Sequence, residues 1–167
     1  MKIYKMLMAA AVFVAFAGSA NAQRKNADLI GTWKLESFTT RHENGTVTQT
    51  YGENPSGYVG YAPDGRMYAF VVRGDRKKAG TGPTKEAEDA KLLRGMTAYS
   101  GSYTRENSTK VILNLDISAD EVLTGMSVAR YILIEGDTLT LSPDDPTVKK
   151  ETRTVSTWKR IRGEASR

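Results

Sequence analysis

Tyrosine is the residue type in this sequence that offers the most chemistry, with eight copies against four of phenylalanine. Each tyrosine has an apolar ring and one hydroxyl, so a few of them around a cavity supply an apolar lining with polar contact points. Six lie in segments with a strand-like pattern. Because side chains alternate along a strand, we expect about two to four of these to face inward. We take the following residues as candidates for ligand binding: Tyr58, Tyr61, Tyr68, Phe70, Tyr99, Tyr103, Asn114, Arg130 and Glu53.

Arg130 is the one charged residue in the apolar run 128–134, on the same expected face as Val128 and Ile132. A guanidinium group among apolar side chains needs a partner. Three kinds of partner would serve: a buried acid, an aromatic ring near Trp33, or an anionic group on a ligand. Glu53, on an expected loop, could transfer protons beside a tyrosine only if the loop carries it into the cavity.

Other catalytic and metal-binding sets are missing from the sequence. The one histidine, His42, precedes a hairpin turn, where we expect a surface residue unless Glu43 orients it toward a pocket. There is no cysteine and no Gly-x-Ser-x-Gly motif, so thiol chemistry, a serine nucleophile elbow and a zinc site are not expected. Asp116, Asp120 and Glu121 lack the spacing of a calcium loop. We therefore expect no metal and no cofactor, and the catalytic residues, if any, are unknown.

The first 22 residues resemble a bacterial-type signal peptide. Lys2 and Lys5 form a basic start, 6–18 is an apolar run, and Ala20-Asn21-Ala22 gives the small-residue cleavage pattern. We expect cleavage after Ala22, export to the periplasm or beyond, and no stable membrane insertion afterwards.

The rest of the chain has the length and charge of one soluble domain. Without Lys2 and Lys5 the formal net charge of +5 falls by two, which is too mild for a nucleic-acid binder. We assign 23–162 to this domain and 163–167 to a disordered tail.

Period-two alternation predicts a series of half-buried strands. In the first, Trp33, Leu35, Ser37 and Thr39 share one face. Hairpin or turn signals stand at Asn44-Gly45, Pro63-Asp64-Gly65, 105–108 and Gly136-Asp137. The expected strands are 32–40, 46–51, 57–62, 66–73, 97–104, 109–118, 127–135, 138–142 and 151–161.

One helix is expected at about 84–96, capped by Thr84, with Ala87, Ala90 and Leu93 on one face. A helix this short is expected to pack on the sheet or cover an opening. Before it, 74–83 is a glycine-rich charged connection without the Gly-Lys-Ser/Thr of a phosphate loop. Eight or nine strands joined by short turns predict an all-β, up-and-down antiparallel barrel.

Gly31-Thr32-Trp33 and Trp158-Lys159-Arg160 stand at the two ends of this pattern. We expect Trp33 to plug one end of the barrel, held by Arg160 or Arg130. The functional end should then be the opposite one, near 53–58, 74–83 and the helix.

The chain resembles the lipocalin-like domain found in many bacterial and fungal proteins, over 28–160. The resemblance implies a small antiparallel barrel with an internal pocket; most members have no assigned activity, and some lie near enzymes of secondary metabolism. In that family the strand at 109–118 often carries histidine, which this sequence lacks. The matching segments are Leu29-Ile30-Gly31-Thr32-Trp33-Lys34-Leu35, Tyr51-Gly52-Glu53-Asn54-Pro55-Ser56-Gly57-Tyr58, Tyr61-Ala62-Pro63-Asp64-Gly65-Arg66-Met67, Tyr99-Ser100-Gly101-Ser102-Tyr103-Thr104, Arg130-Tyr131, Gly136-Asp137-Thr138-Leu139-Thr140-Leu141 and Trp158-Lys159-Arg160.

Three functions follow as hypotheses. The favoured one is an exported protein that binds a small, largely apolar molecule in the barrel cavity. The second is a cofactor-free isomerase, cyclase or hydrolase acting on a small hydrophobic metabolite there, with a tyrosine hydroxyl and Glu53 or Arg130 moving protons. The third is an interaction module that uses the basic loop 73–78. The ligand, any reaction and the oligomeric state stay open.

Overall fold

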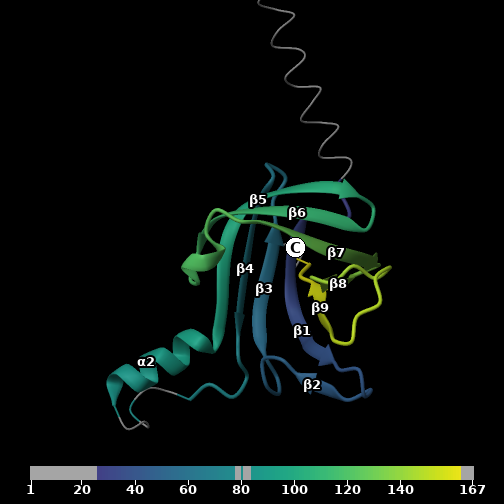
Figure 1. Ribbon diagram of the computed structural model, residues 1–167. Helices are drawn as coiled ribbons and strands as arrows, with labels where there is room; N and C mark the ends of the chain where they lie inside the picture. Colours follow the sequence, from purple (N-terminus) through teal and green to yellow (C-terminus); the bar gives the residue numbers. More distant parts are fainter. Residues whose placement is uncertain (1–25, 78–79, 81–83, 163–167) are drawn as a thin grey trace, which may run out of the picture.

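The fold is given by a computed structural model, which describes residues 26–77, 80 and 84–162 (Figure 1). The expected signal segment 1–22, the tail 163–167 and Lys78 of the basic loop lie outside the described residues. The elements are β1 Gly31–Arg41, β2 Val47–Gln49, β3 Ser56–Tyr61, β4 Arg66–Val72, α2 Lys85–Arg94, β5 Met96–Asn107, β6 Lys110–Ser118, the 3-10 turn η1 Glu121–Leu123, β7 Ser127–Glu135, β8 Thr138–Ser142 and β9 Arg153–Arg160.

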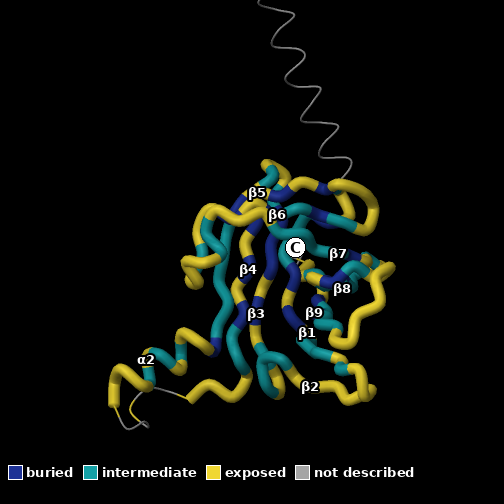
Figure 2. Tube along the Cα trace, viewed as in Figure 1, coloured by how far each residue is buried: buried dark blue, intermediate teal, exposed yellow. Residues whose placement is uncertain are grey.

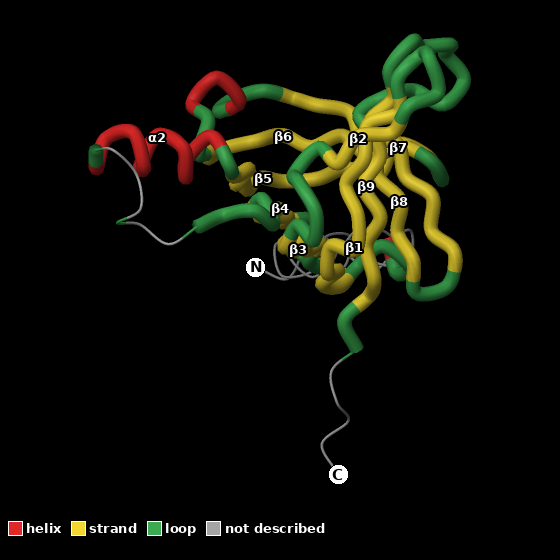
Figure 3. Tube along the Cα trace, turned by 90° about the horizontal axis from the view of Figure 1, so that it is seen from below, coloured by secondary structure: helices red, strands yellow, loops and turns green. Residues whose placement is uncertain are grey.

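The strands form one antiparallel sheet that closes on itself. Their order is β2-β1-β3-β4-β5-β6-β7-β8-β9, and β1 also pairs with β9. The strand β2 stands outside the closed ring, because it pairs only with 39–41 at the far end of β1. Figure 3 shows β3 to β6 on one side of the barrel and β7 to β9 with β1 on the other. The predicted antiparallel barrel is therefore confirmed.

Positive φ angles at glycine account for the predicted turns. Gly45 has a φ of 81° and Gly136 a φ of 60°, values that residues with a Cβ rarely adopt. In the first turn the Asn44 carboxamide oxygen also accepts a hydrogen bond from the Thr46 backbone N–H, at 3.0 Å. These local features join neighbouring strands without help from the rest of the fold.

A β-bulge in β1 overturns the simple alternation expected for that strand. The register with β9 shifts between Leu35 and Ser37, so Phe38 rather than Ser37 lies opposite the buried Ser156. Beyond the bulge the inward residues are therefore Phe38 and Thr40, not Ser37 and Thr39. The extra residue also bends the strand, as closure of a barrel requires.

A second register shift separates Ser100 from Gly101 in the pairing of β5 with β6. Asp116 is the extra residue at this shift; its carboxylate pairs with Arg66 on the outer face, and Ile117 after it is 64% exposed. The turn expected at 105–108 is also displaced, because β5 continues through Asn107.

The helix α2 begins as predicted, with the Thr84 hydroxyl accepting a hydrogen bond from the Ala87 N–H at 3.2 Å. It does not pack on the sheet, which was one of the two expected arrangements: none of its residues is buried, and Leu93 is 55% exposed. Figures 1 and 2 show α2 projecting from the barrel, with only its C-terminal end near β5. Its sequence has too few large apolar residues to hold it against a sheet.

The core fills the barrel around Trp33. Trp33 and Leu29 have no exposed surface, and strands from all around the ring contribute to the same cluster. Other core members include Val59, Met67, Val111, Leu113, Leu139 and Trp158. One end of the interior is therefore packed solid.

Candidate functional site

Arg160 seals the packed end of the barrel. It is one of the two arginines, Arg160 and Arg130, that were predicted to hold Trp33. Its guanidinium lies 3.9 Å from the centre of the Trp33 ring and donates a hydrogen bond to the Ile30 carbonyl at 2.7 Å. The Trp33 indole N–H in turn donates to the Leu29 carbonyl at 3.0 Å. Arg130, the other alternative, has no such contact with Trp33.

A second arginine, Arg105, supports this end. Its side chain is 8% exposed and pairs with Asp28 through both carboxylate oxygens. It also donates to the Ser108 carbonyl at 2.9 Å. The hydrogen bond from Arg105 lowers the pKa of the Asp28 carboxyl. This pair ties the segment before β1 to the β5–β6 hairpin.

Inward-facing side chains further along the interior are only partly buried. They include Phe38 on β1, Tyr99 on β5 and Val128 on β7, all of which pack against the core yet keep some solvent exposure. The inward residues around Trp33, by contrast, are at most a few per cent exposed. Solvent therefore reaches the interior from the side opposite the Trp33 end.

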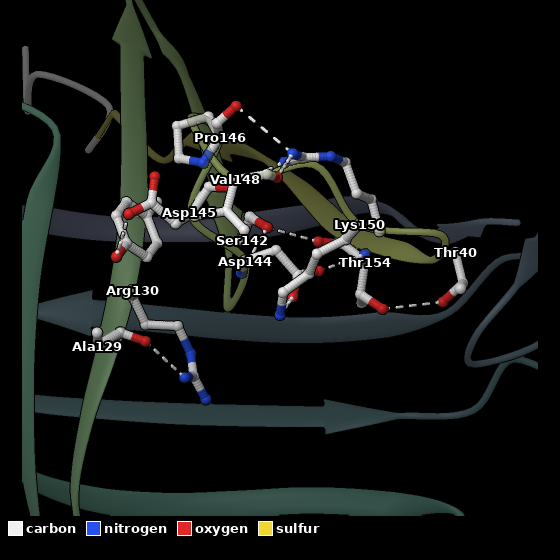
Figure 4. Close-up of polar contacts among 12 residues, drawn as sticks. Thr40, Ala129, Arg130, Ser142, Asp144, Asp145, Pro146, Val148, Lys150 and Thr154 are labelled. Carbon is white, nitrogen blue, oxygen red and sulfur yellow. Dashed lines mark hydrogen bonds and ion pairs between the residues drawn. The ribbon is translucent and has the colours of Figure 1, made fainter. Parts of the chain in front are cut away.

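Arg130 faces the interior, because it lies opposite Val111 of β6 and two residues from the buried Ile132 on β7. One guanidinium nitrogen donates to the neighbouring Ala129 carbonyl at 2.9 Å, as Figure 4 shows. Among residues 26–77, 80 and 84–162, no carboxylate pairs with Arg130. Two of the three partners considered from the sequence are therefore not in contact with Arg130: a buried acid and the Trp33 ring, which Arg160 covers instead.

Three of the six strand tyrosines face inward, within the range expected from alternation. The Tyr61 and Tyr103 rings meet edge to face, 5.0 Å apart at 81°. The Tyr103 hydroxyl donates to the Ala62 carbonyl at 3.0 Å, whereas the hydroxyls of Tyr61 and Tyr99 have no hydrogen-bond partner in the described part of the chain. Burial raises the pKa of Tyr61; nearby Tyr99 adds to the rise and the charge of Arg130 opposes it. Tyr61 is thus a neutral hydroxyl close to a cation.

Five of the nine candidates do not face the interior, and three of these five lie on the outer face of β3 and β4. Tyr58 pairs with Phe70 across β3 and β4, and both are 43% exposed on the outer face. Tyr68 is 45% exposed, and its hydroxyl lies 3.3 Å from the Thr32 hydroxyl. Tyr58 lies at odd offsets from the inward Val59 and Tyr61 of β3, and Tyr68 and Phe70 lie at odd offsets from the inward Ala69 of β4, so alternation sends all three outward.

Asn114 and Glu53 do not reach the interior either. Asn114 is exposed on β6, and its carboxamide oxygen accepts a hydrogen bond from the Ser127 hydroxyl at 2.6 Å. Glu53 is exposed on the loop before β3. The inward candidates are therefore Tyr61, Tyr99, Tyr103 and Arg130.

Sequence reasoning missed a hydroxyl cluster at the solvent-reached end. The Thr40 hydroxyl is hydrogen bonded to those of Thr50, at 2.9 Å, and Thr154, at 3.1 Å. Tyr51 is hydrogen bonded to Thr97 of β5, and the centre of its ring lies 4.9 Å from that of Phe38, with the ring planes tilted by 39°. Only the bulge in β1 brings Phe38 and Thr40 inward, and alternation alone gives no signal for it.

A surface groove of about 370 Å³ lies at this end of the barrel. It lies between the C-terminal end of α2 and η1, which Figure 3 shows beyond the ends of β5 and β6. Thr97 belongs both to the groove and to the inner face, opposite the buried Val71. The other lining residues include Leu93, Met96, Ala98, Ser118 and Leu123.

The histidine lies on the outer surface, at the β1–β2 hairpin. One His42 ring nitrogen is hydrogen bonded to the Thr48 hydroxyl at 2.9 Å, and Glu43 does not orient it toward the interior. A separate groove of about 490 Å³ beside it is lined by Arg41, Lys149, Lys150 and Arg153 together with acidic residues. Among the described residues, no three side chains of metal-ligating type come together as a metal ion would require.

Comparisons with curated proteins and with a similar solved structure assign no function to this chain. No functionally curated protein matches the chain. A similar solved structure is that of an uncharacterized protein from Bacteroides eggerthii DSM 20697, at 13% sequence identity and a TM-score of 0.40, covering 79% of this chain and 98% of that one. In the part of the chain that the structure describes, no helix is long and apolar enough to cross a membrane.

The family comparison agrees with the geometry. The family model of the lipocalin-like domain matches residues 30–161, from the strand that carries Trp33 to the end of β9. This chain belongs to the lipocalin-like domain family.

Proposed function

We propose that this lipocalin-like protein binds a small, largely apolar molecule inside its barrel. The supporting observation is the contrast between the packed Trp33 end and the partly exposed inward residues beyond it, Phe38, Tyr99 and Val128. Aromatic and aliphatic side chains that solvent reaches gain about 25 cal/mol for each Å² that a ligand covers. The groove at Thr97 adjoins the same end of the barrel.

Neither alternative has comparable support. An enzyme of the predicted kind would need a proton acceptor, and Glu53 and His42, the two acceptors considered from the sequence, both lie outside the interior. In the basic loop, Arg73 is engaged with Asp75, at 2.8 Å, and with the Thr50 carbonyl. Its charge is therefore partly neutralised within the protein.

We also propose that the protein acts after export. The support is the signal-like pattern of residues 1–22 alone. Fractionation of expressing cells followed by N-terminal sequencing tests this: the exported protein should begin at Gln23. A cytoplasmic protein that keeps residues 1–22 would contradict it.

Binding is tested with phenylnaphthylamine, a neutral fluorescent probe that brightens in apolar surroundings. The wild-type protein should bind it, and Val128→Trp, which places a large ring in the interior, should weaken binding about 10-fold or more. Leu133→Trp is the matched control, because Leu133 lies on the same strand but is 53% exposed on the outer face. It should change the affinity by less than about 2-fold.

The two tryptophan variants also separate interior from surface binding. Equal effects of both substitutions, or no probe binding to the wild-type protein, would contradict an interior site. Thermal melting checks that each variant is folded, and Val128→Phe serves as a smaller substitution if the tryptophan is not tolerated.

A further inference from the structure

Among the described residues, three arginines face the interior of the barrel, and two of these are engaged by other groups of the protein. Arg160 stacks on Trp33 and bonds backbone carbonyls, and Arg105 pairs with Asp28. Arg130 donates only to the Ala129 carbonyl among the described residues. Since a guanidinium group has five N–H donors and a full charge, this arrangement leaves most of its capacity unused.

We infer that Arg130, with the hydroxyls of Tyr61 and Tyr99, binds a carboxylate group carried by the apolar ligand. The inference rests on the proposed binding function and names the chemical class of the ligand.

Two acids that follow β8 are already engaged elsewhere. Asp144 pairs with Lys150, and Asp145 accepts hydrogen bonds from Tyr131 and Thr147, on the outer side of β7. A cation beside apolar side chains is costly unless an opposite charge accompanies it. Because no described carboxylate pairs with Arg130, a ligand can supply the opposite charge.

The two tyrosines complete a donor set that fits a carboxylate. Tyr61 is 2% exposed, and its hydroxyl, like that of Tyr99, has no hydrogen-bond partner among the described residues. Electrostatic coupling places Tyr61 near both Arg130 and Tyr99, and burial keeps it protonated. A carboxylate has two oxygens and about four acceptor sites, which match one guanidinium fork and two hydroxyls.

The surroundings of Arg130 restrict the rest of the ligand. Its neighbours on the inner face are Val111, Val128 and Ile132. A phosphate, with its larger charge and third terminal oxygen, would leave acceptors unpaired among these apolar groups. The fitting ligand is therefore an apolar molecule with a single carboxylate.

Displacement of phenylnaphthylamine by decanoic acid and by decanol at neutral pH tests the inference. The two competitors share an apolar chain and differ in the head group. Wild-type protein should bind the acid at least about 10-fold more tightly than the alcohol. Arg130→Met should remove that preference, with decanol affinity unchanged within about 3-fold.

Arg66→Met is the matched control, because Arg66 lies on the outer face and pairs with Asp116. It should keep the preference for the acid. Arg130→Met should also melt at the wild-type temperature or above, because it replaces an uncompensated cation with an apolar side chain. A clear fall in melting temperature would assign Arg130 a structural role and overturn the inference.

The outcomes separate the inference from the proposed function. If the neutral probe does not bind, the binding function itself is wrong. If the probe binds but decanoic acid and decanol compete equally, the interior site stands and the carboxylate inference is wrong. A preference that survives in Arg130→Met would also overturn it.

Discussion

Removal of the Arg160 guanidinium should destabilise the sealed end of the barrel and lower the free energy of unfolding. We consider Arg160→Met, which keeps the aliphatic length but loses the charge and the donors. The side chain is 20% exposed, stacks on the buried Trp33 ring and donates to the Ile30 carbonyl. A partly desolvated cation–π contact contributes about 1–2 kcal/mol, and a hydrogen bond from a charged group about 1.5–3 kcal/mol.

These contributions share one group and do not add fully, so we expect the free energy of unfolding to fall by about 2–4 kcal/mol. For a domain of this size the melting temperature should fall by about 6–12 °C. Equilibrium urea denaturation followed by tryptophan fluorescence measures the change directly.

Arg162→Met provides the comparison within the same segment. Arg162 pairs with Asp137, but its side chain is 75% exposed. A surface ion pair of this kind contributes about 0–1 kcal/mol. If Arg160→Met destabilises the protein no more than Arg162→Met, Trp33 does not depend on the guanidinium, and the account of the sealed end is wrong.

Three further changes test other parts of the fold. Gly101→Ala should cost about 3 kcal/mol in urea denaturation, because a Cβ there would lie 2.0 Å from the Asn114 carbonyl oxygen; Gly125→Ala, with only its φ of 80° at issue, should cost about 1 kcal/mol. Pairing lowers the pKa of Asp28, so its stabilisation is complete above the unfolded-state pKa of about 4 and is lost as the pH falls through the lower folded-state value. The stability advantage of the wild type over Asp28→Asn should accordingly shrink in acid, and a constant difference from pH 7 to 2 would contradict the pairing. Thr84→Ala should speed amide hydrogen exchange within α2, at a local cost of about 1 kcal/mol, and leave the melting temperature of the barrel unchanged.

Local patterns in the sequence predict much of this fold. The strands β7 and β8 begin and end where alternation places them, and the turns at Gly45 and Gly136 follow from residues that tolerate positive φ. Tyr58 and Tyr61 lie on opposite faces because they are three residues apart. Which face is inward depends on pairing between distant strands, such as Trp33 opposite Val59, and sequence alternation carries no information about that register.

In the candidate site too, local sequence patterns predict some features, whereas others depend on how distant strands pair. Arg130 stands out in the sequence because it is a charge within an apolar run, and the structure places it inside the barrel. Phe38 and Thr40 were missed because the bulge at 35–37 changes their face, and Phe70 was included because apolar character alone does not distinguish the inner from the outer surface. The projection of α2 likewise depends on the absence of tertiary contacts rather than on helical propensity.

A crystal structure of the protein with decanoate bound tests the central claim most directly. We predict the apolar chain beside Val128 and Tyr99, with the carboxylate within about 3.2 Å of the Arg130 guanidinium and a tyrosine hydroxyl. Decanoate on the outer face, or inside the barrel with its carboxylate turned to solvent while Arg130 still contacts only the Ala129 carbonyl, would contradict it.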